Sequence, residues 1–194
     1  MAIKDNGTEQ LIKDTAKRIF FSDGKLHATT QDIADAAGVN RTLLNYYFRS
    51  KDILFEQVAT EARAEMSEVL DNIFSAGLEF KDKLHQLINV FMEQAMQFPY
   101  REMYVVTELN RTTRSVPEEK KIKVKAFLKE ISAEMDKGKI KKMDPRQFCM
   151  NLFALMAYPL ITNGLNKSLY NMNDAEYLKL MKDRKKLIFE MIYQ

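Results

Sequence analysis

Apolar residues recur at steps of three and four positions along almost the whole chain. This spacing places apolar side chains on one face of an α-helix. No comparable two-residue alternation indicates a β-strand. The sequence therefore predicts an all-α protein of about nine helices, and the spacing is clearest in five segments: Ile12–Phe20, Leu54–Ile73, Leu84–Ala95, Val124–Met135 and Tyr177–Ile192.

Glycine, serine and proline mark the predicted helix ends. Pro117 and Pro145 fit the start of a helix, because a proline in the first turn loses no internal hydrogen bond. Pro159 lies inside an apolar helix, where its ring would clash with the Leu155 carbonyl, so we expect a kink or break there. The other residues near predicted ends are Gly24, Gly38, Ser50, Pro99, Gly138 and Gly164.

We divide the chain at residue 50 into two domains. Residues 1–50 are predicted to hold three short helices, and residues 51–194 six mostly longer ones. The segment from Lys51 to about Ala76 contains no glycine or proline and would be roughly 36 to 39 Å long as a helix. We interpret it as a lever that joins the two domains.

The stretch TTQDIADAAGVNRTLLNYYFRSK, residues 29–51, has the features of a helix-turn-helix. Thr29 followed by Asp32 resembles a capping box. Gly38 suits the left-handed residue that ends a helix, and Asn40 can cap the next one. Two helices of about two turns joined by such a tight turn form a helix-turn-helix. The apolar residues expected to face inward are Ile33, Ala34, Ala37, Val39, Leu44 and Phe48.

The outward side of the second helix carries side chains that can bind base edges. Arg41 can donate two hydrogen bonds to guanine, and Asn45 can pair with adenine. Leu43 or the methyl group of Thr42 can touch a thymine methyl, and Tyr46 lies beside them. Residues suited to phosphate oxygens lie at the flanks: Thr30, Tyr47, Arg49 and Lys51. The plain alternative is an amphipathic hairpin with a solvated basic face, but turn, caps, spacing and the absence of acidic residues coincide here.

The pattern TTxxIAxxAGVxxxxLxxYFxSKxxL, from Thr29 to Leu54, resembles the signature of the tetracycline-repressor (TetR) family. The resemblance implies a homodimeric regulator whose first three helices bind double-stranded DNA and whose remaining helices bind a small molecule and dimerise. By position, Thr30, Tyr47 and Lys51 match the family's phosphate contacts. The positions that match possible base contacts are Gln31, Arg41, Thr42, Leu43 and Asn45.

Three residues depart from the family pattern. The family usually has a small residue, often glycine, at the position of Thr42. Threonine is common at the position of Leu43, and tyrosine at that of Asn45. Losing that tyrosine removes a common backbone contact, so the roles of Asn45 and Tyr46 and the operator sequence do not follow from the resemblance.

The resemblance also implies dimerisation through the last two helices, which we expect at about Asp144–Asn166 and Asp174–Tyr193. Their apolar faces are large enough to pack against a second subunit. A dimer would space two reading helices by about 34 to 36 Å, as successive major grooves require.

A pocket for an apolar or amphipathic effector is expected among the middle helices. Methionines would permit an adaptable cavity, although aromatic and methionine residues at helical spacing are more often plain core. Asn151 and His85 are the polar residues nearest the apolar faces. The candidate lining residues are Phe91, Met92, Phe98, Met103, Tyr104, Phe127, Met156 and Tyr158.

A basic run lies in the predicted helix after Pro117. We interpret it as a solvated face, partly balanced by Glu118, Glu119, Glu130 and Glu134, and a second DNA contact there is disfavoured. Its residues are Lys120, Lys121, Lys123, Lys125 and Lys129.

Composition favours the cytoplasm. The 194 residues are 46% hydrophobic, enough to fill a core, and the net charge of +3 is modest. Cys149 is the single cysteine, so no intramolecular disulfide can form, and the start MAIKDNGTEQ lacks the apolar core of a signal peptide. The uncharged segment 147–166 has a strongly apolar part, Phe148–Ile161, of only 14 residues. This is short of the roughly 20 apolar residues that a membrane-spanning helix needs.

The sequence offers little that an enzyme would need. His27 and His85 are the two histidines, too few for a di-iron bundle with two Glu-x-x-His motifs. There is no Gly-x-Ser-x-Gly, no phosphate loop and no metal-binding spacing, so we predict no cofactor or metal. Ser22 and Lys25 match Ser-x-x-Lys by letter only.

The leading hypothesis is a ligand-responsive transcriptional regulator, most simply a repressor released from its operator by a small molecule. The alternative is an all-α small-molecule-binding protein without sequence-specific DNA binding. A helical hydrolase is a third option, and its activity would survive removal of residues 1–50.

Overall fold

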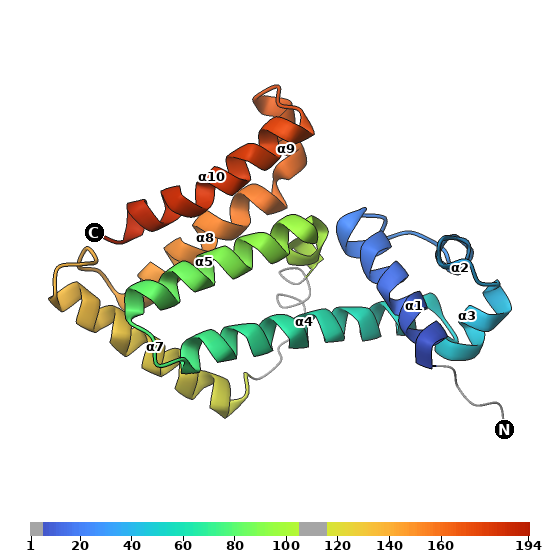
Figure 1. Ribbon diagram of the computed structural model, residues 1–194, viewed down its shortest axis with the longest axis horizontal. Helices are drawn as coiled ribbons and strands as arrows, with labels where there is room; N and C mark the ends of the chain where they lie inside the picture. The colour runs from blue at the N-terminus through green and yellow to red at the C-terminus, as the bar shows by residue number, and fades with distance from the viewer. Residues whose placement is uncertain (1–5, 105–115) are drawn as a thin grey trace. The chain divides into compact units, whose positions relative to one another are not determined.

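The computed structural model describes residues 6–104 and 116–194, so the first five residues of the predicted 1–50 domain lie outside the described part. No strand occurs in the described residues, and the prediction of an all-α fold is confirmed. A π-helix, η1 (Arg18–Ser22), continues α1, and residues 99–104 are also helical. The α-helices are α1 (Asn6–Lys17), α2 (Thr30–Ala37), α3 (Arg41–Phe48), α4 (Lys51–Ser75), α5 (Phe80–Gln97), α7 (Glu118–Asp136), α8 (Pro145–Ile161), α9 (Asn163–Leu169) and α10 (Asp174–Ile192) (Figure 1).

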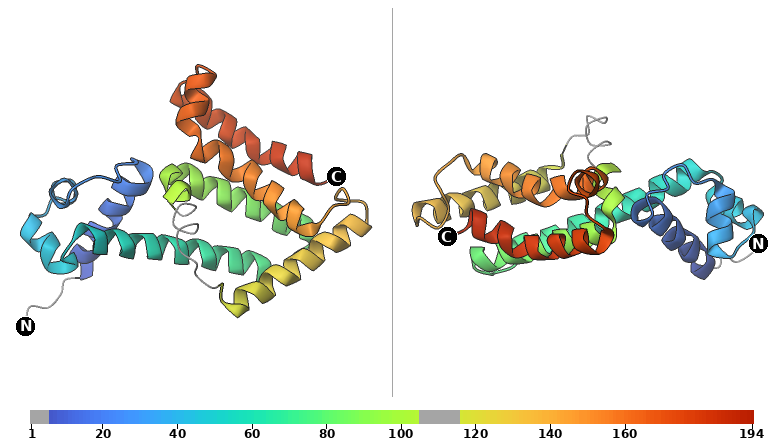
Figure 2. Two further views of the ribbon diagram at one scale, coloured as in Figure 1. Left: turned by 180° about the vertical axis from the view of Figure 1, so that it is seen from behind. Right: turned by 90° about the horizontal axis from the view of Figure 1, so that it is seen from above.

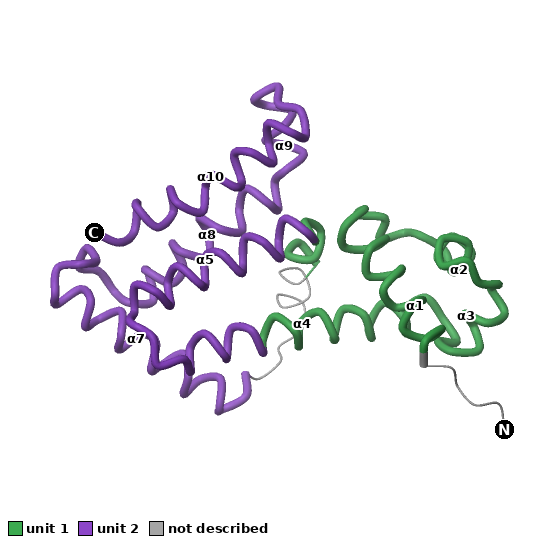
Figure 3. The backbone as a smooth tube through the Cα atoms, in the orientation of Figure 1, with its two compact units in different colours: residues 1–67, 98–105 green, residues 68–97, 106–194 purple. Residues whose placement is uncertain are grey.

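The helices form two units, each with its own core (Figure 3). Unit 1 comprises the described residues up to 67 together with 98–104, and unit 2 comprises residues 68–97 and 116–194. The uninterrupted helix predicted from Lys51 is present as α4, which begins in unit 1 and ends in unit 2. The predicted boundary at residue 50 separates a DNA-binding part from a ligand-binding part. The packing units do not test that functional boundary, so it stays a prediction.

The core of unit 1 is built by α1, η1, α2, α3 and the first half of α4. Ile12 and Ala16 are buried one helical turn apart on α1. The wider turn of η1 follows, and the neighbouring side chains of Phe20 and Phe21 are both fully buried. The Phe55 ring on α4 meets the Phe20 ring edge-on, with centroids 4.9 Å apart.

Residues 98–104 pack onto the core of unit 1. The Tyr104 ring meets the Phe55 ring at 4.7 Å between centroids, and the Tyr100 ring lies against Gly24. Gly24 has φ +70°, and a Cβ atom there would lie 2.6 Å from the Tyr100 ring. Glycine at position 24 thus permits both the left-handed turn and this close approach.

Unit 2 is a bundle in which α5 packs against α7, α8 and α10 (Figure 2). Leu84, Leu87 and Ile88 of α5 are almost completely buried. The Phe127 ring of α7 lies between Phe74 of α4 and Phe80 of α5, with centroids 4.8 and 5.6 Å away.

A break follows Pro159, close to its predicted position. α8 ends at Ile161, α9 begins at Asn163, and the two axes differ by 70°. Proline has no N–H to donate to the Leu155 carbonyl, which instead accepts a 2.8 Å hydrogen bond from Arg184 Nε. In the described chain no single helix is long and apolar enough to cross a membrane. Only the bent α8–α9 pair, taken together, has the length and apolar composition of a membrane span.

Most of the basic run on α7 is exposed to solvent, as predicted. The prediction that Glu134 lies on this solvated face is wrong. Glu134 is buried and accepts a 2.7 Å hydrogen bond from Tyr193 Oη near the end of the chain. Burial alone would raise the pKa of this carboxyl, but the hydrogen bonds from Lys137 and Tyr193 outweigh it and the pKa is lowered. Glu130, in turn, forms an ion pair with the buried Lys83.

Candidate nucleic-acid interface

The start of α2 and the turn between α2 and α3 are fixed by the capping interactions that the sequence predicts. The Thr29 N–H donates to Asp32 Oδ2 at 2.7 Å and the Asp32 N–H donates to Thr29 Oγ1 at 3.2 Å, which completes the capping box. The bond from the Thr29 backbone is the main reason that the pKa of Asp32 is lowered. Gly38 is left-handed at φ 68°, and Asn40 Oδ1 accepts from the Leu43 N–H at 2.8 Å.

Buried anchors hold α3 against the rest of unit 1. Leu44 and Phe48, four residues apart, are 0% and 1% exposed. Ile33 and Ala34 of α2 are also fully buried, so both helices present their apolar faces to one core. The predicted inward positions are confirmed, and the opposite edge of α3 is left for solvent.

The outward edge of α3 carries the predicted base-contacting residues. Arg41, Thr42 and Tyr46 are exposed, and Leu43 and Asn45 are half-buried. Within the described residues, nothing hydrogen-bonds to or pairs with the side chains of Arg41, Thr42 or Asn45. No acidic residue occurs between Asp35 and Asp52, so this edge combines free donors with an acid-free surface.

The other residues predicted to contact DNA differ in how they are held. Lys51 Nζ donates to the Leu26 carbonyl at 2.7 Å. Gln31 donates to Asp35 Oδ1 at 2.7 Å. The Tyr46 and Tyr47 rings meet edge-on at 5.4 Å, and Thr30 is half-buried. Contact of these side chains with DNA stays a prediction, and Lys51 and Gln31 would have to exchange their present partners.

Arg49 joins α3 to α4 through an unusual backbone conformation. It has φ 60° and ψ −41°, and its N–H donates to the Asn45 carbonyl at 2.9 Å, which ends α3. Ser50 follows, and its Oγ accepts from the Ile53 N–H in the first turn of α4. The exposed Arg49 side chain is therefore set at the end of the reading helix.

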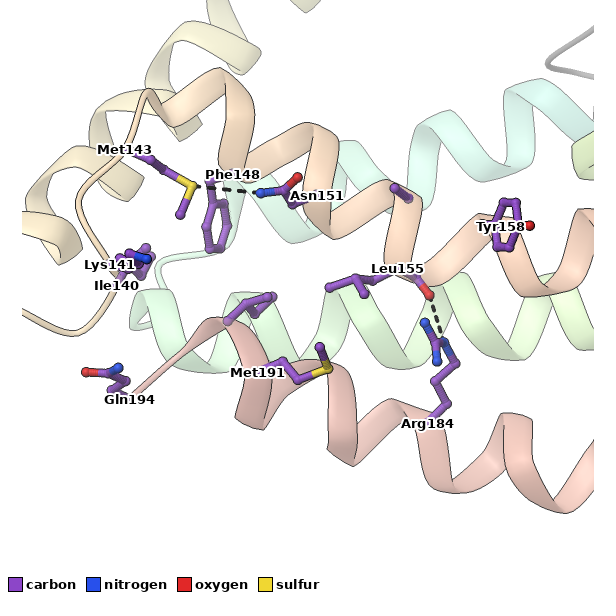
Figure 4. A pocket seen from close by; sticks show the side chains of 12 residues that line it. Ile140, Lys141, Met143, Phe148, Asn151, Leu155, Tyr158, Arg184, Met191 and Gln194 are labelled. Carbon is purple, nitrogen blue, oxygen red and sulfur yellow. Dashed lines mark hydrogen bonds between the residues drawn. The ribbon is translucent and has the colours of Figure 1, made fainter.

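Unit 2 contains a cavity of about 530 Å³ between α8, α10 and the loop before α8 (Figure 4). Of the eight predicted pocket residues, Tyr158 lines it, and Asn151 lines it as well. Met92, Phe91, Phe127 and Met156 lie in the core of unit 2, whereas Phe98, Met103 and Tyr104 belong to unit 1. Ligand contact by these residues stays a prediction.

Sequence reasoning missed Arg184, which lines this cavity. It looks like one more charge on a helix rich in lysine, and its role depends on a carbonyl freed by a proline on another helix. His85 stacks on Phe189 with ring centroids 3.6 Å apart. This packing role agrees with its predicted position beside an apolar face.

Large apolar side chains remain exposed on the last three helices of unit 2. Tyr158 of α8 is 61% exposed and Leu169 of α9 is 66% exposed. Exposed apolar surface on this scale is typical of a protein interface. The others are Met150, Phe153, Leu165, Tyr170, Leu178, Leu180, Leu187 and Met191.

The α2–α3 unit, its acid-free outer edge and the all-α body define a helix-turn-helix DNA-binding protein. Residues 12–58 match the model of the bacterial regulatory proteins of the tetR family. The match spans α2, α3 and the start of α4, so it is the helix-turn-helix part of the chain that is similar to this family.

Solved structures share this fold over nearly the whole chain. A TetR family transcription regulator from Marinobacter aquaeolei VT8 is 14% identical, with a TM-score of 0.57 and 98% of each chain covered. A transcriptional regulator of the TetR/AcrR family from Thermobifida fusca YX-ER1 is 16% identical, with a TM-score of 0.55, covering 95% of this chain and 97% of that chain. At these identities the likeness concerns the fold alone. No curated protein matches the chain in sequence.

Proposed function

We propose that this protein is a TetR-family transcriptional regulator, a cytoplasmic repressor that binds its operator as a homodimer and is released by an apolar or amphipathic small molecule. The observation that carries the DNA-reading part is the outer edge of α3, where Arg41 and Asn45 lie one turn apart with no partner among the described residues. Both can make paired hydrogen bonds to one base, Arg41 to guanine and Asn45 to adenine.

In this proposal the middle of α3 supplies specificity and its flanks supply affinity. The residues that would meet bases beside Arg41 and Asn45 are Gln31, Thr42, Leu43 and Tyr46. Phosphate contacts do not distinguish sequences, but they fix how the reading helix enters the groove. They would come from Thr30, Tyr47, Arg49 and Lys51.

The dimer we propose forms through α8 and α10. Both helices bury one face in the core of unit 2 and still expose large apolar side chains on another. Two helices from each subunit would form a four-helix interface that covers this surface. A two-fold dimer would also double the number of phosphate contacts.

We place the effector site in unit 2, where the candidates belong to one core: Phe91 and Met92 of α5, Phe127 of α7 and Met156 of α8. Effector and DNA would each lower the affinity for the other by the same factor, because the coupling free energy belongs to both binding equilibria. Release of the repressor then needs an effector that prefers the DNA-free conformation.

The test is selection of bound duplexes from random DNA, together with fragments of the promoters of this gene and its neighbours. The expected site has two related half-sites with two-fold symmetry. Arg41→Ala should weaken binding to the selected site by about 1 to 3 kcal/mol and relax the preference at one base pair of each half-site.

Lys120→Ala is the matched control, because Lys120 is an exposed cation on α7 and its removal changes the charge equally. It should leave the sequence preference unchanged. If the wild-type protein prefers no sequence and its affinity does not fall with salt, the proposal is wrong, and the alternative of an all-α small-molecule-binding protein takes its place.

A further inference from the structure

The outer face of α10 carries a ridge of four residues, Leu180, Asp183, Arg184 and Leu187. Their spacing of i, i+3, i+4 and i+7 places them on one side of the helix. Leu180 and Leu187, at the two ends of the ridge, are 50% and 49% exposed. The two charged residues lie between them.

Arg184 is held in place by the break in α8. Its Nε donates to the Leu155 carbonyl, the acceptor left without an N–H by Pro159 (Figure 4). The guanidinium is half-buried beside the cavity, and burial lowers its pKa. No carboxylate of the described residues lies within ion-pair distance of it. A half-buried guanidinium without a counter-charge would be stabilised by a carboxylate from outside the chain.

Asp183 is the complement of Arg184. It is exposed, and no described residue forms an ion pair or hydrogen bond with it. It cannot turn back to its neighbour in an ion pair, because adjacent residues on a helix do not face each other. The ridge thus presents one unpaired cation and one unpaired anion side by side.

The ridge is self-complementary under a two-fold axis. In such an interface residue i meets residue j of the partner while j meets i. An axis between positions 183 and 184 brings Leu180 against the partner's Leu187 and Arg184 against the partner's Asp183, each contact occurring twice. Helices packed at about 8 to 10 Å place such side chains within reach of one another.

We propose that α10 of a second copy crosses this ridge between residues 183 and 184, and that the reciprocal Arg184–Asp183 pairs set the register and specificity of the homodimer. This inference rests on the proposed dimer through α8 and α10 and adds its register. The leucine contacts contribute apolar burial, and the ion pairs exclude shifted alignments, in which like charges would meet.

The test uses two charge reversals and their mixture. Asp183→Arg places arginine opposite the partner's Arg184, and Arg184→Asp places aspartate opposite the partner's Asp183. Each variant alone should dimerise at least about tenfold more weakly than wild type by sedimentation equilibrium, and the difference should shrink at high salt. Mixed together, the two variants should form heterodimers, because both pairs in the heterodimer then join opposite charges.

Asp183→Arg is the safer single variant, since Asp183 makes no ion pair or hydrogen bond within the described part of its own chain. Lys182→Asp is the matched control: it is an exposed charge reversal on the other side of α10 and should leave dimerisation unchanged. If wild type dimerises and Asp183→Arg dimerises equally well, or the mixture forms no heterodimer, the register is wrong while the dimer stands. If wild type is a monomer at all accessible concentrations, the proposed dimer itself is wrong.

Discussion

At the scale of single residues, Arg49 adopts a backbone conformation that suits glycine better than arginine. Its φ of 60° with ψ −41° lies outside the regions that residues with a Cβ atom prefer. Such a conformation costs of order 1 to 3 kcal/mol. Arginine at this position is understandable if the side chain binds a phosphate at the end of α3, so stability and DNA affinity are expected to oppose each other here.

Arg49→Gly should therefore stabilise the protein and weaken DNA binding. Relief of the backbone strain stabilises the folded protein, whereas the greater flexibility of glycine stabilises the unfolded chain. The net effect should be to raise the free energy of unfolding by about 1 kcal/mol. Glycine cannot bind the phosphate that we propose Arg49 contacts, so the salt slope of DNA binding should fall by about 1 for each such phosphate. Urea unfolding and DNA titrations at several salt concentrations measure the two effects.

Asn171→Gly provides the control for this trade-off. Asn171 also has a positive φ, of 50°, but it lies between α9 and α10 in unit 2. Asparagine tolerates this region better than arginine, so the gain in stability should be smaller, with DNA affinity unchanged. If Arg49→Gly binds DNA as tightly as wild type, Arg49 makes no phosphate contact.

At the scale of elements, helix ends were predictable where a local side chain determines them. Thr29 with Asp32, Gly38, Asn40 and Pro145 all lie at helix ends as their types and spacing indicate. The predicted faces of α2 and α3 were right for the same reason, because helical spacing alone decides which side chains share a face.

Features that depend on distant partners were not predictable. η1 has no sequence signal, because a wide turn keeps nearly the same apolar spacing. The Arg184–Leu155 bond joins residues on two helices, and burial of Glu134 depends on Tyr193 near the end of the chain. The packing of residues 98–104 in unit 1, rather than with α5, likewise depends on aromatic contacts far apart in sequence.

The contribution of the N-terminal cap of α8 to the stability of the protein should depend on pH. Asp144 accepts the Arg146 N–H at 2.8 Å and Arg146 Nε at 2.9 Å, and these bonds lower its pKa from 3.8 to about 2. Because the folded pKa lies below the unfolded one, this contribution to stability is present above 3.8 and is lost as the pH falls through about 2.

Carbon-detected NMR of the Asp144 carboxyl should show a titration midpoint near about 2 in wild type. In Arg146→Ala the midpoint should move upward, toward 3.8, because the main hydrogen-bond donor is gone. Asp144→Asn keeps a capping oxygen without the charge, so its stability relative to wild type should improve as the pH is lowered. A wild-type midpoint at 3.8 would contradict the assigned role of Arg146.

At the scale of the whole molecule, the proposed function depends on two reading helices acting together. A single α3 offers few side chains to bases, whereas a two-fold dimer adds the binding free energies of two half-sites. Dimer strength and DNA affinity are therefore linked: whatever weakens the dimer should also weaken binding to a two-half-site operator, even when every DNA-contacting residue is intact.

This linkage yields a quantitative prediction for Asp183→Arg, which leaves α2 and α3 untouched. The logarithm of the DNA binding constant falls linearly with the logarithm of the salt concentration, with a slope proportional to the number of phosphates contacted. At concentrations where the variant is monomeric, its slope should be about half that of wild type, and its affinity for a single half-site should equal that of the wild-type subunit. Fluorescence anisotropy with one-half-site and two-half-site duplexes measures both quantities. A monomeric variant that keeps the full wild-type slope would mean that one subunit makes all the phosphate contacts.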